Sequence, residues 1–165
     1  MTLSLQKKID PKTVKGYGDP EYFINKCDVA MLDMPQRECP LIHRFAPGMY
    51  IREILIPKDT LLTTLMHLTT HPFFIMKGDV SVWYHDIPVQ RYQAPYTGIT
   101  QAGTRRMLFA HEDTIWSTCH ITDLTDPDEI VQSVTCMDFN PMIDSNHPRT
   151  QTWRHNKKIV KEIEI

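Results

Sequence analysis

The middle of the chain, from Met49 to Ile121, is a series of short segments rich in β-branched and aromatic residues, and each segment ends at turn residues. Such segments favour strands, because β-branched and aromatic side chains fit a pleated surface. Many short strands at close spacing are typical of a β-sandwich or a β-barrel. The pattern therefore predicts an all-β domain. Its expected strands are residues 49–56, 60–70, 73–76, 80–84, 89–93, 98–100, 105–110 and 114–121.

Two histidines lie at the end of the segment 60–70 and just beyond it. Because side chains two residues apart on a strand point to the same face, His67, Thr69 and His71 are expected to share one face. Pro72 separates this strand from the next apolar strand, which ends at a Lys-Gly-Asp turn at 77–79. One wall of the domain is therefore expected to carry two imidazoles.

Composition excludes several classes of protein. The chain has 165 residues, with 18 Lys plus Arg against 20 Asp plus Glu, so neither nucleic acid nor a membrane surface is an expected partner. The four cysteines are scattered, which favours reduced thiols over a disulfide framework. No apolar run reaches the ~20 residues of a membrane span, and the start lacks the apolar stretch of a signal peptide. Secretion by that route is not expected.

The two ends of the chain differ from the middle. Residues 1–44 are rich in proline and lack sustained periodicity, which predicts an extended N-terminal arm. Within that arm, residues 21–32 are expected to form a short helix or a strand. The strand-rich domain is expected to span residues 45–125.

Residues 126–165 form the expected C-terminal arm. A short helix is predicted at its start, with Thr125 as N-cap, acidic residues in the first turn, and residues 129–134 continuing it. Residues 158–165 alternate isoleucine with charged residues, which predicts a half-buried strand suited to pairing at the sheet edge of a neighbour. We expect both arms to pack on neighbouring subunits.

Three stretches of the sequence resemble a known family: TLLTTLMHLTTHPFFIMKGDVSV, APYTGITQAGTRR and HEDTIWSTCHIT. With their order and spacing, residues 45–125 resemble a cupin. More narrowly, they are similar to small cupin-like proteins encoded by tailed bacteriophages. The resemblance implies a single jelly roll (double-stranded β-helix) whose barrel mouth holds a metal or a small ligand. It also implies a place in the virion or in the host cytoplasm.

The match departs from the usual cupin metal motifs. When the first motif is aligned on Gly78, His71 stands where a Glu belongs, His67 stands at the second His, and Leu65 stands at the first. The second motif has Arg106 in place of its His. Only one ligand position keeps its usual residue, so the resemblance does not imply an inherited metal site.

A replacement metal site can still be assembled from His67, His71 and His120. Three imidazoles suit zinc, iron or manganese, with one position open to water or a ligand. Two histidines four apart on one strand lie about 13 Å apart at Cα, which is too far for one ion unless Pro72 bends His71 back. The alternative is that these histidines form hydrogen bonds within a polar barrel interior.

A small anionic ligand is the second candidate. Arg105 and Arg106 are adjacent on a strand and face opposite ways, so only one of them can enter the barrel. Arg106 then either clamps a carboxylate or phosphate, or forms a structural ion pair with Glu112 or Asp113. Tyr96 lies in a segment expected to close over such a ligand.

Two functions remain open. The favoured one is a non-enzymatic cupin of a phage-like source that assembles through its arms, with copies of itself or with neighbouring virion proteins. The alternative is a small-molecule binder or metal-dependent enzyme whose barrel mouth is lined by His67, His71, Tyr96, Arg106 and His120. Neither motif nor spacing supports a Ser-His-Asp or Cys-His arrangement, so no catalytic residue is assigned.

Overall fold

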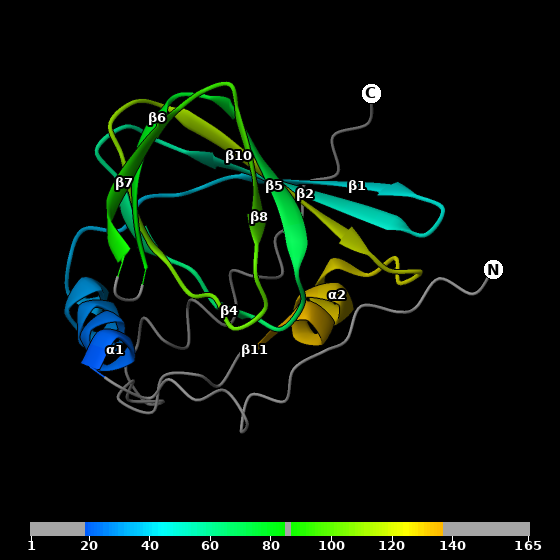
Figure 1. Cartoon of the computed structure of the whole chain (residues 1–165), viewed down its shortest axis with the longest axis horizontal. Coiled ribbons are helices and arrows are strands. Elements are labelled where there is room, and N and C mark those ends of the chain that lie inside the picture. Colours follow the sequence, from blue (N-terminus) through cyan, green and yellow to red (C-terminus); the bar gives the residue numbers. More distant parts are fainter. Residues whose placement is uncertain (1–18, 85–86, 137–165) are drawn as a thin grey trace.

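The computed structural model describes residues 19–84 and 87–136 (Figure 1). Two helices, α1 (Asp19–Leu32) and α2 (Pro127–Val134), flank a series of short strands. The strands are β1 (Leu41–Ala46), β2 (Met49–Ile56), β3 (Leu61–Thr63), β4 (Met66–His67), β5 (His71–Lys77), β6 (Asp79–Tyr84), β7 (Ile87–Gln93), β8 (Tyr96–Thr100), β9 (Met107–Ala110), β10 (Thr114–Ile121) and β11 (Thr135–Cys136).

The strands form two facing antiparallel sheets. Sheet A has the order β1-β2-β10-β5-β8 and sheet B has the order β3-β9-β6-β7, while β11 and β4 form a small third sheet. Strand β10 returns between β2 and β5, and β9 returns between β3 and β6, so late strands insert between early ones. This is the jelly-roll arrangement, and it confirms the predicted all-β fold.

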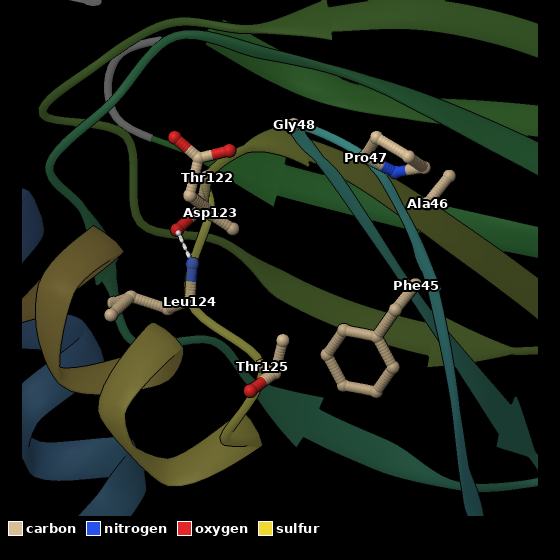
Figure 2. A pocket seen from close by; sticks show the side chains of 8 residues that line it. All are labelled: Phe45, Ala46, Pro47, Gly48, Thr122, Asp123, Leu124 and Thr125. Atoms are coloured by element: carbon tan, nitrogen blue, oxygen red, sulfur yellow. Dashed lines mark hydrogen bonds between the residues drawn. The ribbon is translucent and has the colours of Figure 1, made fainter.

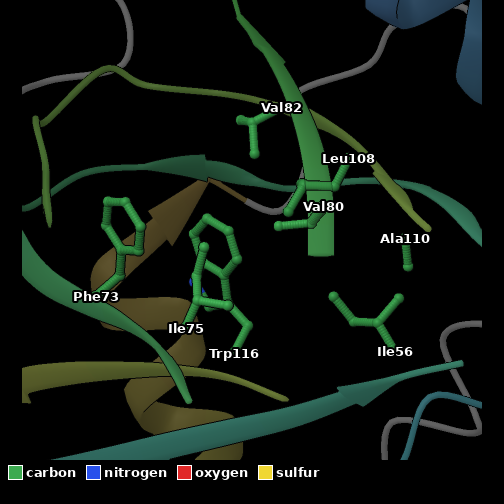
Figure 3. Close-up of a cluster of buried hydrophobic side chains, with 8 residues drawn as sticks. All are labelled: Ile56, Phe73, Ile75, Val80, Val82, Leu108, Ala110 and Trp116. Carbon is green, nitrogen blue, oxygen red and sulfur yellow. The ribbon is translucent and has the colours of Figure 1, made fainter. Parts of the chain in front are cut away.

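The core fills the space between the two sheets. Eight buried side chains from both sheets point toward one another (Figure 3). The rings of Phe73 and Trp116 stack within it, with centroids 4.5 Å apart and planes 8° from parallel. Each buried side chain of this size contributes about 1.5–3 kcal/mol by leaving water. The cluster consists of Ile56, Phe73, Ile75, Val80, Val82, Leu108, Ala110 and Trp116.

A tight turn at Gly78 joins the two sheets, as the Lys-Gly-Asp sequence predicts. Gly78 has a φ of +98°, and a Cβ there would meet the Asp113 carbonyl oxygen at 2.7 Å. Only glycine combines that backbone conformation with that close approach. The adjacent Asp79 then accepts hydrogen bonds from Arg91 (2.8 and 2.9 Å) and Gln93 (3.0 Å), which tie β6 to β7.

The single strand predicted for residues 60–70 is wrong. Strand β3 ends at Thr63 and β4 is a separate pair of residues. This part of the chain forms backbone hydrogen bonds with the segment between β8 and β9, beginning with the Thr64 N–H, which donates to the Arg106 carbonyl. The His67 N–H donates to the Thr104 carbonyl, and the Gly103 N–H donates to the His67 carbonyl. Pro72 does not end a strand either. It lies within β5, whose pairing with β10 starts only at Phe73, so its missing N–H costs no hydrogen bond there.

The segment predicted as an N-terminal arm contains two elements. Residues 21–32 lie in helix α1, whose Ile24 is buried and whose Phe23 packs edge-on against Trp83 of β6. Strand β1, which was not predicted, pairs along its full length with β2.

The predicted C-terminal helix is α2, but its N-cap is Asp126 and not Thr125. The Asp126 carboxylate accepts the backbone N–H groups of Asp128 and Glu129, and an aspartate can satisfy both where the helix begins at Pro127. Ile130 and Val134 of α2 pack on Tyr50 and cover one end of the barrel. The predicted strand at 158–165 and the ends of both arms lie outside the described residues.

Two further expectations concern the whole chain. All four cysteines are free thiols in the structure, as the scattered spacing predicts. Among the helices that the structure describes, none is long and apolar enough to cross a membrane.

Candidate functional site

Three histidines meet inside the barrel. His67 of β4, His71 of β5 and His120 of β10 have ring centroids 4.5 Å (67 to 71), 4.2 Å (71 to 120) and 6.5 Å (67 to 120) apart. The expected separation of His67 and His71 along one strand does not apply, because they lie on two different strands. The structure thus brings together the three predicted metal ligands.

Hydrogen bonds fix which nitrogens of two of these rings carry a proton. His71 Nδ1 lies 3.0 Å from the Thr69 carbonyl oxygen, so Nδ1 donates and Nε2 keeps its lone pair. The Thr118 hydroxyl donates to the Arg52 carbonyl (3.4 Å) and therefore accepts from His120 Nε2 (3.2 Å). His120 Nδ1 keeps its lone pair in turn. These proton positions follow from the partners.

The free nitrogens are buried. His71 Nε2, His120 Nδ1 and His67 Nδ1 have no hydrogen-bond partner among the described residues. Burial lowers the pKa of His71 to about 4 and that of His120 to about 3. Burial also lowers the pKa of His67 well below its usual range, with the neighbouring histidines and arginines adding to the effect. All three imidazoles are therefore neutral at pH 7.

Neutral imidazoles with free lone pairs are the chemistry that a transition metal requires. The carbonyl of Thr69 and the hydroxyl of Thr118 orient two of the rings, as the outer partners of metal ligands do. The spacing is less suitable: rings bound to one ion at about 2.0–2.1 Å have centroids about 5 Å apart. Accordingly, no set of three or more His, Cys, Asp or Glu side chains in residues 19–84 and 87–136 is already placed to hold an ion. The three imidazole nitrogens are suitable metal donors, but the rings would have to move to equal distances from a single ion.

Arg106 forms the second part of the site. Its side chain is buried, with 7% exposed, and Nη1 donates to Thr100 Oγ1 at 2.8 Å. The guanidinium carbon lies 5.0 Å from the ring centre of Phe73, 5.6 Å from that of Tyr84 and 6.0 Å from that of Trp116. Burial lowers the pKa of Arg106, and the nearby tyrosines partly offset that effect.

The predicted ion pair of Arg106 with Glu112 or Asp113 is wrong. Both acids lie in the exposed turn between β9 and β10, where the Asp113 carboxylate accepts the backbone N–H of Lys58 at 2.9 Å. Within the part of the chain that the structure describes, no carboxylate pairs with Arg106. A buried cation is thus left without an acidic side chain as partner.

Arg106 faces a cavity of about 210 Å³ inside the barrel. Three tyrosines line the cavity with it: Tyr84 of β6, Tyr92 of β7 and Tyr96 of β8. The rings of Tyr92 and Tyr96 lie 4.3 Å apart, and Gly98 leaves room for the Phe73 ring beside them. Tyr96 therefore lines the cavity wall, and the structure places it with Arg106.

Arg105 points to the other side, as strand alternation predicts. It is held by helix α1, with Nη1 donating to Asn25 Oδ1 at 2.6 Å and Nη2 paired with the Asp28 carboxylate. Nε donates to the Thr64 carbonyl at 3.0 Å. Arg105 is thus a structural tie between α1 and the barrel, whereas Arg106 is free to meet a ligand.

Sequence reasoning missed three residues at the histidine end. The Tyr50 hydroxyl and His43 Nδ1 are 2.5 Å apart, and the Tyr50 ring lies 6.2 Å from His120. Arg52 Nε is buried without a partner among the described residues. The sequence of β2, MYIREILI, contained a signal for two of them. Tyr50 and Arg52 lie an even number of residues from the buried Ile56, so all three point to the same, inward face of the strand. Burial raises the pKa of Tyr50 to about 12, so this hydroxyl stays protonated.

A second cavity, of about 330 Å³, opens at the outside of the molecule (Figure 2). It lies between the β1–β2 turn, at Phe45 and Gly48, and the segment that follows β10, at residues 122–125. The Thr122 hydroxyl there accepts the backbone N–H of Leu124 at 3.1 Å. This cavity contains none of the histidines or arginines of the barrel interior.

The fold and site together define a jelly-roll protein whose barrel encloses both a hydrophobic core and buried polar side chains. No family model matches the sequence, and no curated protein matches it. Solved structures with a similar fold include a cupin-2 domain protein from Shewanella frigidimarina, with 13% identity over 59% of this chain and 92% of that one and a TM-score of 0.42. The Cnp3 cupin domain of Schizosaccharomyces pombe has 13% identity, 61% and 70% coverage, and a TM-score of 0.42.

A cupin superfamily protein from Desulfitobacterium hafniense is similar at 6% identity, with 57% and 86% coverage and a TM-score of 0.45. These three are cupin proteins, the class that the sequence motifs resemble. At such identities and scores, the function has to be argued from the site itself.

Proposed function

We propose that the barrel binds a small molecule carrying a carboxylate or a phosphate, and that Arg106 receives the anionic group. The observation that carries this proposal is the buried guanidinium of Arg106, which faces a cavity and has no carboxylate partner among the described residues. A buried charge costs several kcal/mol unless an opposite charge compensates it. Among the described residues, the side chains near Arg106 supply aromatic faces, the Thr100 hydroxyl and tyrosine hydroxyls, all of them neutral groups.

The geometry also limits the ligand. A volume of about 210 Å³ equals roughly seven water molecules at about 30 Å³ each, so the ligand is a small acid and not a polymer. One guanidinium nitrogen already binds Thr100, and the planar group has further donors for a bidentate contact with two anion oxygens. Tyrosine hydroxyls in the cavity wall donate and accept hydrogen bonds, which suits a ligand with a second polar group.

Calorimetric titration with phosphate and with a panel of small mono- and dicarboxylates tests this proposal. At least one of these ligands is expected to bind the wild-type protein, and Arg106→Met is expected to abolish that binding. Arg91→Met is the matched control, because Arg91 pairs with Asp79 on the outside and its side chain is 58% exposed. Binding that survives in Arg106→Met, or is lost equally in Arg91→Met, would contradict the proposal.

A divalent metal at His67, His71 and His120 is the second candidate, favoured by their three buried and unpartnered nitrogens. Zinc, iron or manganese bound there would supply a Lewis acid inside the barrel. These residues would hold the metal: Thr69 and Thr118 orient two of the rings, and burial keeps all three imidazoles neutral.

Metal analysis of untagged protein, followed by titration with each ion, tests the second candidate. Wild-type protein is expected to bind one equivalent, and His120→Gln is expected to lose it. His111→Gln on the outside of sheet B is the control. A wild-type protein that takes up no ion, or a His120→Gln variant that binds as tightly as wild type, would sink the idea.

Assembly through the two arms stays a prediction. Residues 1–18 and 137–165 lie outside the described part of the chain, and the comparisons carry no information on a phage source or a virion. Deleting residues 158–165 and measuring the mass of the assembly tests it, and an unchanged mass would contradict the role of the terminal strand.

A further inference from the structure

The cavity beside Arg106 has a wall of aromatic rings that come from both sheets. Aromatic residues make up most of the described side chains that line it, and Val82 and Ile99 supply the aliphatic part. The aromatic residues are Phe73 of β5, Tyr96 of β8 and Trp116 of β10 from sheet A, and Tyr84 of β6 and Tyr92 of β7 from sheet B.

The rings surround the place where an anion on Arg106 would lie. The guanidinium carbon is 5.0 Å from the ring centre of Phe73 in sheet A and 5.6 Å from that of Tyr84 in sheet B. The rings of Tyr92 and Tyr96, one from each sheet, lie 4.3 Å apart with planes 33° from parallel. A ligand whose charged group binds Arg106 therefore has its remaining atoms among aromatic rings.

The charge of the cavity favours a carboxylate over a phosphate. Among the described residues that line it, Arg106 is the only one with a charged side chain. One positive charge balances one carboxylate, whereas a phosphate monoester carries about −1.5 to −2 at pH 7. The two oxygens of a carboxylate also match the bidentate contact that a guanidinium offers. The ligand is therefore expected to have one carboxylate.

The volume limits the ligand to a single ring. An apolar cavity of about 150 Å³ accepts one benzene molecule. The cavity of about 210 Å³ leaves about 60 Å³ beyond that, which is roughly the space of two water molecules. A carboxylate with at most one small ring substituent fits this remainder, whereas a carboxylate with a second fused ring does not.

We propose that the barrel binds an aromatic carboxylic acid of the benzoate class. This ligand rests on the proposed anion site, because its carboxylate is placed on Arg106. Its ring lies among Tyr84, Tyr92 and Tyr96, where offset and edge contacts between rings are favourable at centroid distances of about 4.5–7 Å. Arg106 thus orients the acid, and the aromatic wall selects it.

Calorimetric titration with matched acids separates the ring from the charge. Benzoate and cyclohexanecarboxylate have the same charge and the same carbon skeleton, but only benzoate is flat and aromatic. Wild-type protein is expected to bind benzoate at least about 10-fold more tightly than cyclohexanecarboxylate, and to bind naphthoate at least about 10-fold more weakly than benzoate. Equal affinities for benzoate and cyclohexanecarboxylate would overturn the proposal, and naphthoate binding as tight as that of benzoate would overturn the limit to one ring.

Tyr84→Leu tests the aromatic wall within the protein. The substitution removes a ring that lies 5.6 Å from the guanidinium and keeps an apolar side chain in its place. It is expected to reduce the preference for benzoate over cyclohexanecarboxylate at least about 3-fold. Phe45→Leu is the control, because Phe45 is 46% exposed and lines the outer cavity instead. An unchanged preference in folded Tyr84→Leu would contradict the role of the ring, and the comparison of acids on the wild-type protein does not depend on this variant.

Arg106→Met distinguishes the aromatic wall from the anion site. If an aliphatic acid binds as tightly as benzoate and its binding is lost in Arg106→Met, the anion site stands and the aromatic selection is wrong. If the wild-type protein binds none of these acids and no phosphate, the anion site itself is wrong, and the benzoate-class ligand falls with it.

Discussion

Two adjacent arginines provide the sharpest prediction, because their environments are opposite. Arg105 and Arg106 are both buried, with 6% and 7% of their surfaces exposed. Arg105 is paired with Asp28, whereas Arg106 has no carboxylate partner among the described residues. Replacing each by methionine keeps the length of the side chain and removes the charge.

Arg105→Met and Arg106→Met are expected to change the free energy of unfolding by clearly different amounts. Arg105→Met removes the guanidinium that pairs with the Asp28 carboxylate, whose side chain is only 11% exposed, and breaking this buried pair is expected to cost about 3–5 kcal/mol. Arg106→Met loses one charge-assisted hydrogen bond, worth about 1.5–3 kcal/mol, and cation–π contacts worth about 0.5–2 kcal/mol. It also relieves a buried, uncompensated charge that costs several kcal/mol. The losses and the relief are of similar size, so the net change is expected to lie within about 2 kcal/mol of zero.

Urea unfolding at pH 7, followed by tryptophan fluorescence, measures both changes. Trp116 lies 6.0 Å from the guanidinium of Arg106, and Trp83 contacts Phe23 of α1, the helix to which Arg105 is bound. The ligand-free protein must be used, because a bound anion would stabilise the wild type alone. If Arg106→Met loses as much stability as Arg105→Met, then Arg106 has a compensating partner within the protein, and the reasoning for an anion site fails.

Three other predictions concern stability. The unfolded histidine pKa is about 6.5, and burial lowers the pKa of His71 to about 4 and that of His120 to about 3, so the unfolded chain binds more protons below pH 6.5. The free energy of unfolding is therefore expected to fall from pH 7 to pH 5 by about 2 kcal/mol for each of these histidines. It is measured by urea unfolding in the presence of a chelator, and equal values at pH 7 and pH 5 would refute this prediction. Gly78→Ala combines a φ of +98° with a Cβ contact at 2.7 Å, so a loss of more than about 2 kcal/mol is expected in the same assay. Asp126→Ala removes the acceptor of two backbone N–H groups and is expected to cost about 1 kcal/mol, and no loss would argue against Asp126 as the N-cap of α2.

The regular parts of the molecule could be predicted from the sequence. Strand β10 is continuous, so its period of two correctly places Thr118 and His120 on one face. Gly78 is likewise predictable, because its turn requires a residue that tolerates positive φ.

The histidine site could not be predicted in the same way. The break between Thr63 and Met66 depends on backbone hydrogen bonds to residues 103–106, which are some forty positions away. The period of a continuous strand therefore gave the wrong separation for His67 and His71. The proton positions on His120 depend on a chain of bonds through Thr118 to Arg52, which no local pattern contains.

The contacts of Arg106 could not be predicted either, because the chain folds the nearby acidic residues away from it. Glu112 and Asp113 are near Arg106 in sequence, but the β9–β10 turn carries them to the outside, while Arg106 stays inside with Thr100 and Phe73. Proximity in sequence is a weak guide to ion pairs between strands.

The most direct test of the anion site is crystallographic. A crystal of the protein soaked in 3-bromobenzoate, a carboxylate whose aryl bromine is an unreactive anomalous scatterer, reports where the barrel holds an anion. We predict an anomalous peak in the cavity lined by Tyr84, Tyr92 and Tyr96, with the carboxylate on the Arg106 guanidinium. An empty cavity, with Glu112 or Asp113 turned inward onto Arg106, would contradict the account.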